Sequence, residues 1–143
     1  MRDVNFCMMR LARAIYELFE SDMATLQGAE EQHSHEIDRE LRLEFTDCSD
    51  LYIAWCSHPT QYAVGYQEKR WNVTDPEHIV DVSQWKIWRE LIGQEISFVF
   101  HSPANQVLEL RGDRSSVYCS SQERGSWQAD VLHLSLEKPE FRS

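Results

Sequence analysis

The stretch that decides the predicted fold class runs from Asp81 to Leu110 and reads DVSQWKIWRELIGQEISFVFHSPANQVLEL. Asp81 is a residue type that caps helices, and Gly93 is the residue type that ends them in a left-handed turn. Between these positions the large apolar residues recur at spacings of three and four: Trp85, Trp88 and Ile92. After Gly93, apolar and polar residues alternate, as in strands with one solvated face. We therefore predict a helix over about residues 82–92, followed directly by antiparallel strands.

The N-terminal part of the chain, residues 1–28, has a longer helical pattern that ends at Gly28. Its apolar residues follow helical spacing with one small shift of register: Val4, Met8, Leu11, Ile15, Leu18, Phe19, Met23 and Leu26. A stripe of this length packs either on the domain's own sheet or against the same helix of a second chain. We expect a long N-terminal helix, with a homodimer through that helix as the alternative to intramolecular packing.

Residues 41–137 have the alternation of a sheet, whereas residues 29–40 form a polar, acidic connection. The apolar positions that alternate with polar or small ones include Leu41, Leu43, Phe45, Tyr62, Val64, Tyr66, Ile96, Phe98, Phe100, Leu132, Leu134 and Leu136. The first three strands are expected to form a meander. With the two helices, this pattern predicts an α+β fold with a curved, mainly antiparallel sheet or partial barrel of six to seven strands, in one domain over residues 1–143.

The chain carries 24 acidic and 14 basic side chains, which gives a formal net charge of −10. This charge repels phosphate backbones and favours basic protein partners, although solubility alone also accounts for it. Apolar runs are shorter than the ~20 residues that span a bilayer, and Asp3 and Arg10 interrupt the region that a signal peptide needs. We therefore expect no nucleic acid, no membrane contact, a cytoplasmic location and four free cysteines.

No motif of a known reaction type stands in the sequence. The serines lack the glycine-flanked elbow of a hydrolase nucleophile, and the five glycines are scattered singly rather than in a phosphate-binding loop. Cys56 lies two residues before His58, but burial of Cys56 in the sheet is the simpler interpretation. The sequence therefore favours a protein without catalytic residues and without a cofactor.

The candidates for metal ligands are two histidines in the acidic connection, His33 and His35. On a strand, both side chains would point to the same side, where a neighbouring carboxylate could join them. A structural metal site needs a third and a fourth ligand fixed by the fold, and the sequence identifies neither. We therefore predict no metal site.

Two groups of residues are candidates for binding. The first surrounds Trp71 in a polar segment, where an exposed indole beside arginine is typical of a protein-binding hot spot. It comprises Tyr62, Tyr66, Arg70 and Trp71. The second would line a pocket between the curved sheet and the second helix. It comprises Trp85, Trp88, His101 and Glu109.

These observations favour a small acidic binding protein that captures a basic protein partner without catalysis. In size and charge alone it resembles the small acidic proteins with which bacteria neutralise toxins, so a neutralising or immunity-like role belongs to this expectation. The alternative is a small-molecule-binding protein or enzyme that uses the aromatic pocket between sheet and helix.

Overall fold

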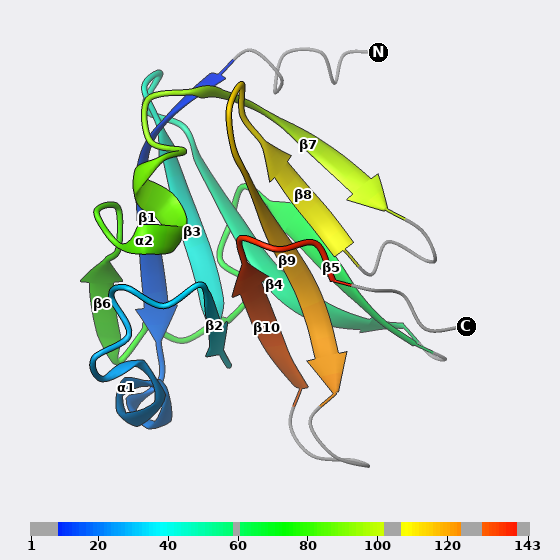
Figure 1. Cartoon of the computed structure of the whole chain (residues 1–143). Helices are drawn as coiled ribbons and strands as arrows, with labels where there is room; N and C mark the ends of the chain where they lie inside the picture. The colour runs from blue at the N-terminus through cyan, green and yellow to red at the C-terminus, as the bar shows by residue number, and fades with distance from the viewer. Residues whose placement is uncertain (1–8, 59–60, 102–106, 124–129, 140–143) are drawn as a thin grey trace.

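The computed structural model describes residues 9–58, 61–101, 107–123 and 130–139, without the side chains of 56–58, 61–63, 121–123 and 130. The strands are β1 (Met9–Leu18), β2 (Ser34–Ile37), β3 (Glu40–Phe45), β4 (Asp50–His58), β5 (Gln61–Gln67), β6 (His78–Asp81), β7 (Glu95–His101), β8 (Val107–Arg111), β9 (Ser116–Glu123) and β10 (Asp130–Ser135). The helices are α1 (Glu20–Leu26) and α2 (Lys86–Arg89). The described part of the chain is therefore mostly sheet (Figure 1).

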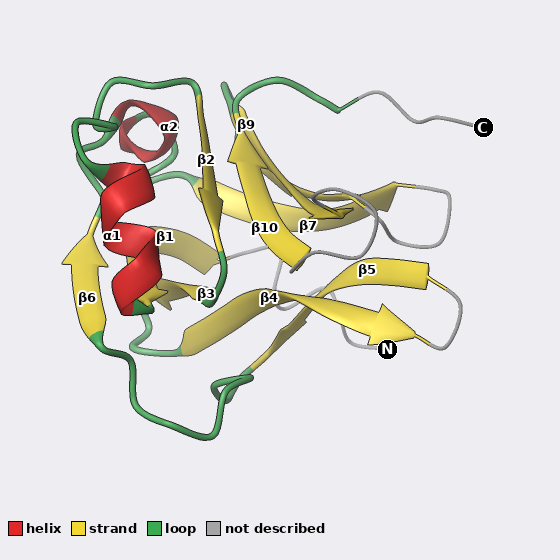
Figure 2. Cartoon of the chain, turned by 90° about the horizontal axis from the view of Figure 1, so that it is seen from below, coloured by secondary structure: helices red, strands yellow, loops and turns green. Residues whose placement is uncertain are grey.

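Backbone pairing links the strands into one antiparallel path in the order β2-β10-β9-β8-β7-β1-β3-β4-β5, and β6 pairs with β1 beside this path. The path folds over on itself, because β4 and β5 pack against β8, β9 and β10. Figures 1 and 2 show the two layers that result. The short elements α1, α2 and β6 lie together at one side of these layers (Figure 2).

The hydrophobic core lies between the two layers and is closed by the segment around α2. Side chains from both layers are completely buried: Leu11, Leu41, Leu43, Ile53, Leu108, Leu110, Leu132 and Leu134. Ile87, Trp88 and Leu91 are also completely buried and belong to the same cluster. Removal of this apolar surface from water is the main term that stabilises the fold.

The predicted long N-terminal helix is wrong, and with it the α+β fold class. Residues Met9–Leu18 form β1, only Glu20–Leu26 is helical, and residues 1–8 lie outside the described part. The physical reason is that residues 14–18 are buried without a break, so this half of β1 is covered on both faces. Such a strand does not alternate, and its apolar spacing cannot be told from that of a helix. The helix-mediated homodimer loses its structural basis, because Leu11, Ile15 and Leu18 of the predicted stripe are buried in β1.

The predicted helix over 82–92 is reduced to α2. Asp81 does not cap it: Asp81 pairs with Ile15 of β1, and its carboxylate accepts hydrogen bonds from the backbone N–H (2.9 Å) and hydroxyl (2.5 Å) of Ser83. Contact with β1 continues to Val82, whose N–H donates to the Ala14 carbonyl (2.9 Å), and a turn closed by the Trp85 N–H and the Val82 carbonyl (2.9 Å) then precedes α2. Gly93 does adopt the predicted left-handed conformation, with φ 89°.

The predicted strands are present, and three further strands were missed. The strands β3, β4 and β5 form the expected antiparallel meander, and β7 to β10 lie where alternation placed them. The missed strands are β1, β6 and β2. Strand β2 lies within the segment that was predicted to be a polar connection. It pairs with β10, and its His35 and Ile37 are buried.

A chain of three buried polar side chains joins α2, β1 and β2. The indole N–H of Trp88 donates to the Tyr16 hydroxyl (2.9 Å), and Tyr16 lies 2.7 Å from Nδ1 of His35. The other ring nitrogen, Nε2, lies 2.8 Å from the Ala29 carbonyl, which can only accept. Nε2 therefore carries a proton, and in the neutral ring Nδ1 accepts the hydroxyl proton of Tyr16. Burial lowers the pKa of His35, which keeps this arrangement intact at neutral pH.

Removal of the Tyr16 hydroxyl leaves two buried groups without a partner, the Trp88 N–H and His35 Nδ1. We expect Tyr16→Phe to lower the free energy of unfolding by about 1–3 kcal/mol, measured by urea denaturation. Tyr118→Phe is the control, since Tyr118 is only half-buried and its hydroxyl makes no hydrogen bond within the described residues. Equal stability of Tyr16→Phe and the parent protein would contradict a stabilising role for the hydrogen-bonded chain of Trp88, Tyr16 and His35, which we call the buried relay.

No helix in the described ranges combines the length and apolar character needed to cross a membrane. Of the four cysteines, Cys48 and Cys119 are free thiols, the first exposed and the second buried. Burial raises the pKa of the Cys119 thiol far above its usual range, so this sulfur is not a nucleophile at neutral pH. The side chains of Cys7 and Cys56 lie outside the described part of the chain.

Candidate functional site

An open groove of about 630 Å³ lies between α1, β6 and the start of α2. We call it the α1–β6 groove. It is lined by Glu20, Met23, Ala24, Leu26, Gln27, Gly28, Glu30, Val80 and Trp85. Most of these side chains are apolar, and the charged ones are two carboxylates without any lysine or arginine among them. The groove is thus an apolar floor with an acidic rim.

Trp85 is held rigidly at one end of this groove. Its ring meets the rings of Tyr16 and His35 edge to face, with centroid distances of 6.1 Å and 5.3 Å. The side chain is half-buried. Trp71 and Trp88 donate their indole N–H groups to protein acceptors, whereas that of Trp85 has no acceptor among the described residues. A fixed indole with an unused donor is the kind of side chain that forms a binding hot spot.

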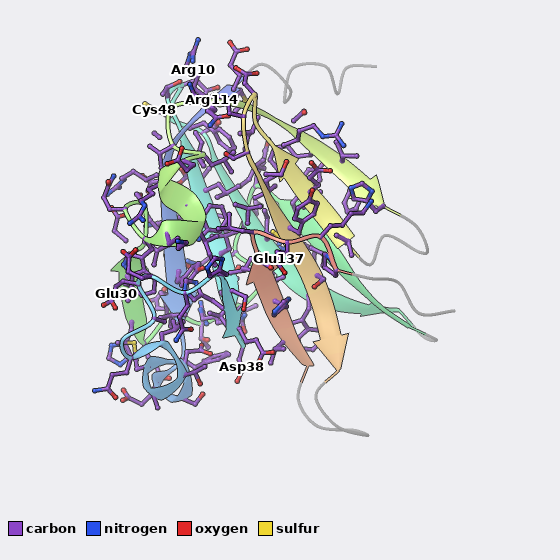
Figure 3. The ribbon with its side chains drawn as sticks, viewed as in Figure 1. Arg10, Glu30, Asp38, Cys48, Arg114 and Glu137 are labelled. Atoms are coloured by element: carbon purple, nitrogen blue, oxygen red, sulfur yellow. The ribbon has the colours of Figure 1, made fainter. Side chains whose placement is uncertain are left out.

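The two carboxylates lie at opposite ends of the groove. Glu20 is at the start of α1, where its Oε1 lies 2.6 Å from Nε2 of His78 at the beginning of β6. Glu30 lies near α2, because its backbone carbonyl accepts the N–H of Lys86 (2.8 Å). Figure 3 shows Glu30 at the side of the molecule that carries α1 and α2. Glu137, which follows β10, lies away from that side. A cation near either end of the groove therefore meets a carboxylate.

Trp71 and Arg70, predicted as binding residues, are used to hold their own segment against the sheet. Arg70 donates two hydrogen bonds to the buried carboxylate of Glu17 (2.7 Å and 3.1 Å). The Trp71 backbone N–H donates to Glu40 (2.8 Å), and its indole N–H donates to the Tyr52 carbonyl (2.8 Å). These contacts leave Trp71 half-buried with its polar groups occupied.

The other two predicted binding residues lie on β5. The ring of Tyr66 stacks on Phe100 with an interplanar angle of 11° and lies 5.0 Å from the ring of Phe98, so it packs between the two layers. The side chain of Tyr62 lies outside the described part. Tyr66 therefore does not join Arg70 and Trp71 in one exposed patch.

Buried charges explain why the Trp71 segment is fixed so firmly. Glu17, Arg39 and Glu40 are almost completely buried, and each is paired: Glu17 also lies 3.2 Å from Arg42, and Arg39 lies 3.7 Å from Glu40. Arg39 donates to the Thr74 carbonyl (2.5 Å). Removal of one partner of such a pair leaves an uncompensated buried charge, which is strongly destabilising. This network therefore has a structural role.

The predicted pocket residues divide into two separate groups. Trp85 and Trp88 contact Tyr16, as described above. Glu109 instead accepts hydrogen bonds from Arg111 (2.9 Å and 3.0 Å) and Ser116 (2.6 Å) and lies 2.9 Å from Nε2 of His101. These bonds, chiefly those from Arg111, lower the pKa of Glu109 to about 2. A carboxylate stabilised in this way is a poor general base near neutral pH.

The two histidines considered as candidate metal ligands differ in their surroundings. His33 is exposed, whereas both ring nitrogens of His35 are used by Tyr16 and Ala29. In the described ranges, no three residues among histidine, cysteine, aspartate and glutamate are arranged to hold a metal ion. His35 is thus part of the buried relay.

Sequence reasoning missed the α1–β6 groove because it depends on β6, which was not predicted. Its signals were present but scattered. Glu20 and Met23 lie in the segment assigned to a long helix, Glu30 in the polar connection, and Trp85 in the second helix. The pairing of β6 with β1, together with the contacts of Glu20 with His78 and of Glu30 with Lys86, brings these segments together.

Comparisons with known proteins add no constraint on this site: no family model, no curated protein and no solved structure matches the chain.

The hydrogen bonds to Glu109 make the stability of the protein depend on pH in a defined window. The pKa of Glu109 is lowered from 4.5 to about 2, so its stabilising contribution is present above pH 4.5 and is lost as pH falls toward 2. We expect Glu109→Gln to lose less free energy of unfolding than the parent protein across this window, measured by urea denaturation at a series of pH values. Glu137→Gln, at an exposed position, should follow the parent curve. Parallel curves for all three proteins would contradict this assignment.

Proposed function

We propose that this protein is a binding protein without catalysis that captures a basic segment of a protein partner in the α1–β6 groove. The observation that carries the proposal is the composition of the groove: an apolar floor that ends in Trp85, with carboxylates and no lysine or arginine in the rim. Apolar contact supplies affinity in such a site, and opposite charge supplies the rate and specificity of association.

The charge of the whole chain supports the same partner. With a net charge of −10, the protein attracts cations from a distance, and the groove offers them the carboxylates of Glu20 and Glu30. Binding through its cationic side chains would cover the basic surface with which the partner contacts an anionic target. The proposal therefore includes a neutralising role. Free Cys48 and Cys119 support a reducing, cytoplasmic location.

The second candidate is a small cationic ligand in the same groove. The volume of about 630 Å³ lies within the range of small-molecule sites, and Trp85 supplies an aromatic wall. A peptide partner is favoured because the groove is open along β6, whereas small ligands are usually enclosed over most of their surface.

Selection from a library of random displayed peptides tests the proposal. We expect the enriched peptides to carry an apolar residue flanked by lysine or arginine, because this chemistry complements the floor and rim of the groove. The double variant Glu20→Lys/Glu30→Lys should bind the enriched peptides at least about tenfold more weakly, measured by fluorescence anisotropy. Trp85→Ala should also weaken binding, whereas Trp71→Phe should not.

The matched control is Asp113→Lys/Glu137→Lys, which changes the net charge by the same amount at exposed positions outside the groove. Equal weakening by the two double variants would mean that only overall charge matters and would contradict the groove. Enrichment of acidic peptides would contradict the proposal altogether. Saturable binding of an alkylammonium ion, without any enriched peptide, would favour the small-ligand candidate.

A further inference from the structure

The strand β6 borders the α1–β6 groove and has one unpaired edge. Val82 donates its N–H to the Ala14 carbonyl (2.9 Å), and the register places Tyr16 opposite Val80 and Glu17 opposite Ile79. Because backbone groups of successive residues point to opposite edges of a strand, those of Val80 face β1 and those of Ile79 and Asp81 face away. In the described ranges, no backbone partner pairs with these outward groups.

This outward edge lies at the boundary of the molecule. Figures 1 and 2, which view the protein from directions 90° apart, both show β6 at the margin with no strand beyond it. Ile79 is 55% exposed, which is unusual for a large apolar side chain in this protein. The edge therefore offers two N–H groups, two carbonyl groups and an apolar side chain to a neighbour.

The edge and the groove are continuous. Side chains alternate along β6, so that Val80 lines the groove while Ile79 and Asp81 lie on the other face. A strand added beside β6 would also alternate. Every second side chain would enter the groove, and the intervening ones would lie beside Ile79 and Asp81.

We propose that the basic partner segment binds as an extended strand along the free edge of β6, with an apolar side chain seated in the α1–β6 groove. This inference rests on the proposed function and specifies the conformation and sequence pattern of the partner. The backbone supplies part of the affinity through ladder hydrogen bonds, and the groove supplies side-chain specificity, as in other cases of strand addition.

The positions of the two carboxylates set the spacing of the partner's charges. Glu20 lies at the His78 end of β6, and Glu30 lies at the α2 end. A central apolar residue above the groove then has a lysine or arginine two residues before it and another two residues after it, all on one face. The two cations are four residues apart, or roughly 13 Å along an extended chain. The pattern is basic-x-apolar-x-basic, where x is any residue.

The first test scans a bound peptide from the library selection with single backbone N-methyl groups. N-methylation removes one hydrogen-bond donor and blocks strand pairing at that residue. We expect a loss of affinity of about tenfold at every second position and little loss at the intervening ones. The parent protein is used throughout, so the result does not depend on the folding of a variant.

The second test changes β6 itself. Ile79→Pro removes an N–H that points away from β1, so the pairing with β1 is retained, and proline is tolerated at such edge positions. Ile79→Thr is the control, since it keeps the N–H and the preference for a strand while removing apolar surface. We expect Ile79→Pro to bind the peptide about tenfold more weakly than Ile79→Thr.

The outcomes separate this inference from the function on which it rests. Uniform tolerance of N-methylation, or losses spaced by three and four residues, would overturn strand addition while groove binding by a basic peptide stands. Enriched basic peptides that lack the basic-x-apolar-x-basic spacing would also overturn it. Failure to enrich any basic peptide would remove the proposed function and this inference together.

Discussion

Pairing of β1 with three other strands is the constraint on which the rest of the structure depends. Its second half, from Ile15 to Glu17, pairs with β3 on one edge and with β6 on the other. Its first residues, Met9 and Arg10, pair with β7. A single strand thereby joins the two layers and carries β6 at the same time. The groove exists because β6 is attached to β1 while α1, which follows β1 directly, turns back beside it.

The second half of β1, residues 14–18, has no solvated face, so each of its polar groups needs a partner inside the protein. On one face, Tyr16 is satisfied by Trp88 and His35, which ties α2 and β2 to β1. On the other face, Glu17 is satisfied by Arg42 and Arg70, which ties down the segment that carries Trp71. The two buried networks therefore stabilise the connections that pure strand pairing would leave loose.

The sequence predicted what depends on local pattern and missed what depends on distant pairing. Half-buried strands such as β3 alternate visibly, and Gly93 has the left-handed backbone that its residue type suggests. The strand β1 was read as a helix, because Leu11, Ile15 and Leu18 fit helical spacing and a strand covered on both faces does not alternate. The helix after Trp85 was predicted to be longer than it is, because the pairing of Asp81 with the distant Ile15 cannot be recognised from the local sequence. The groove requires that β1 is a strand and that α2 is short. Because both features were mispredicted, neither the position of the groove nor its acidic ends could be assigned from the sequence. The half-buried state of Trp71 could not be assigned from sequence either, since its hydrogen-bond partners Glu40 and Tyr52 are distant along the chain.

The net charge favours a basic partner but does not say where on the surface it would bind. The ion pairs of the structure show which carboxylates are already paired with arginine. Arginines are the commonest cations of this chain, and within the described part seven of them have a carboxylate within 4 Å: Arg10, Arg13, Arg39, Arg42, Arg70, Arg89 and Arg111. Their carboxylate partners, such as Glu17 and Glu109, are already compensated and attract a further cation only weakly. The excess negative charge must therefore reside on acids that no arginine reaches. Within the ranges that the structure describes, Glu20 has His78 as its ion-pair partner, and Glu30 lines the groove with no lysine or arginine in the lining. Glu20 and Glu30 are thus two of the acids that carry the excess charge, and they differ from exposed acids such as Asp113 and Glu137 because they line an apolar floor. In the proposed complex, charge attraction and apolar burial therefore act on the same segment of the partner.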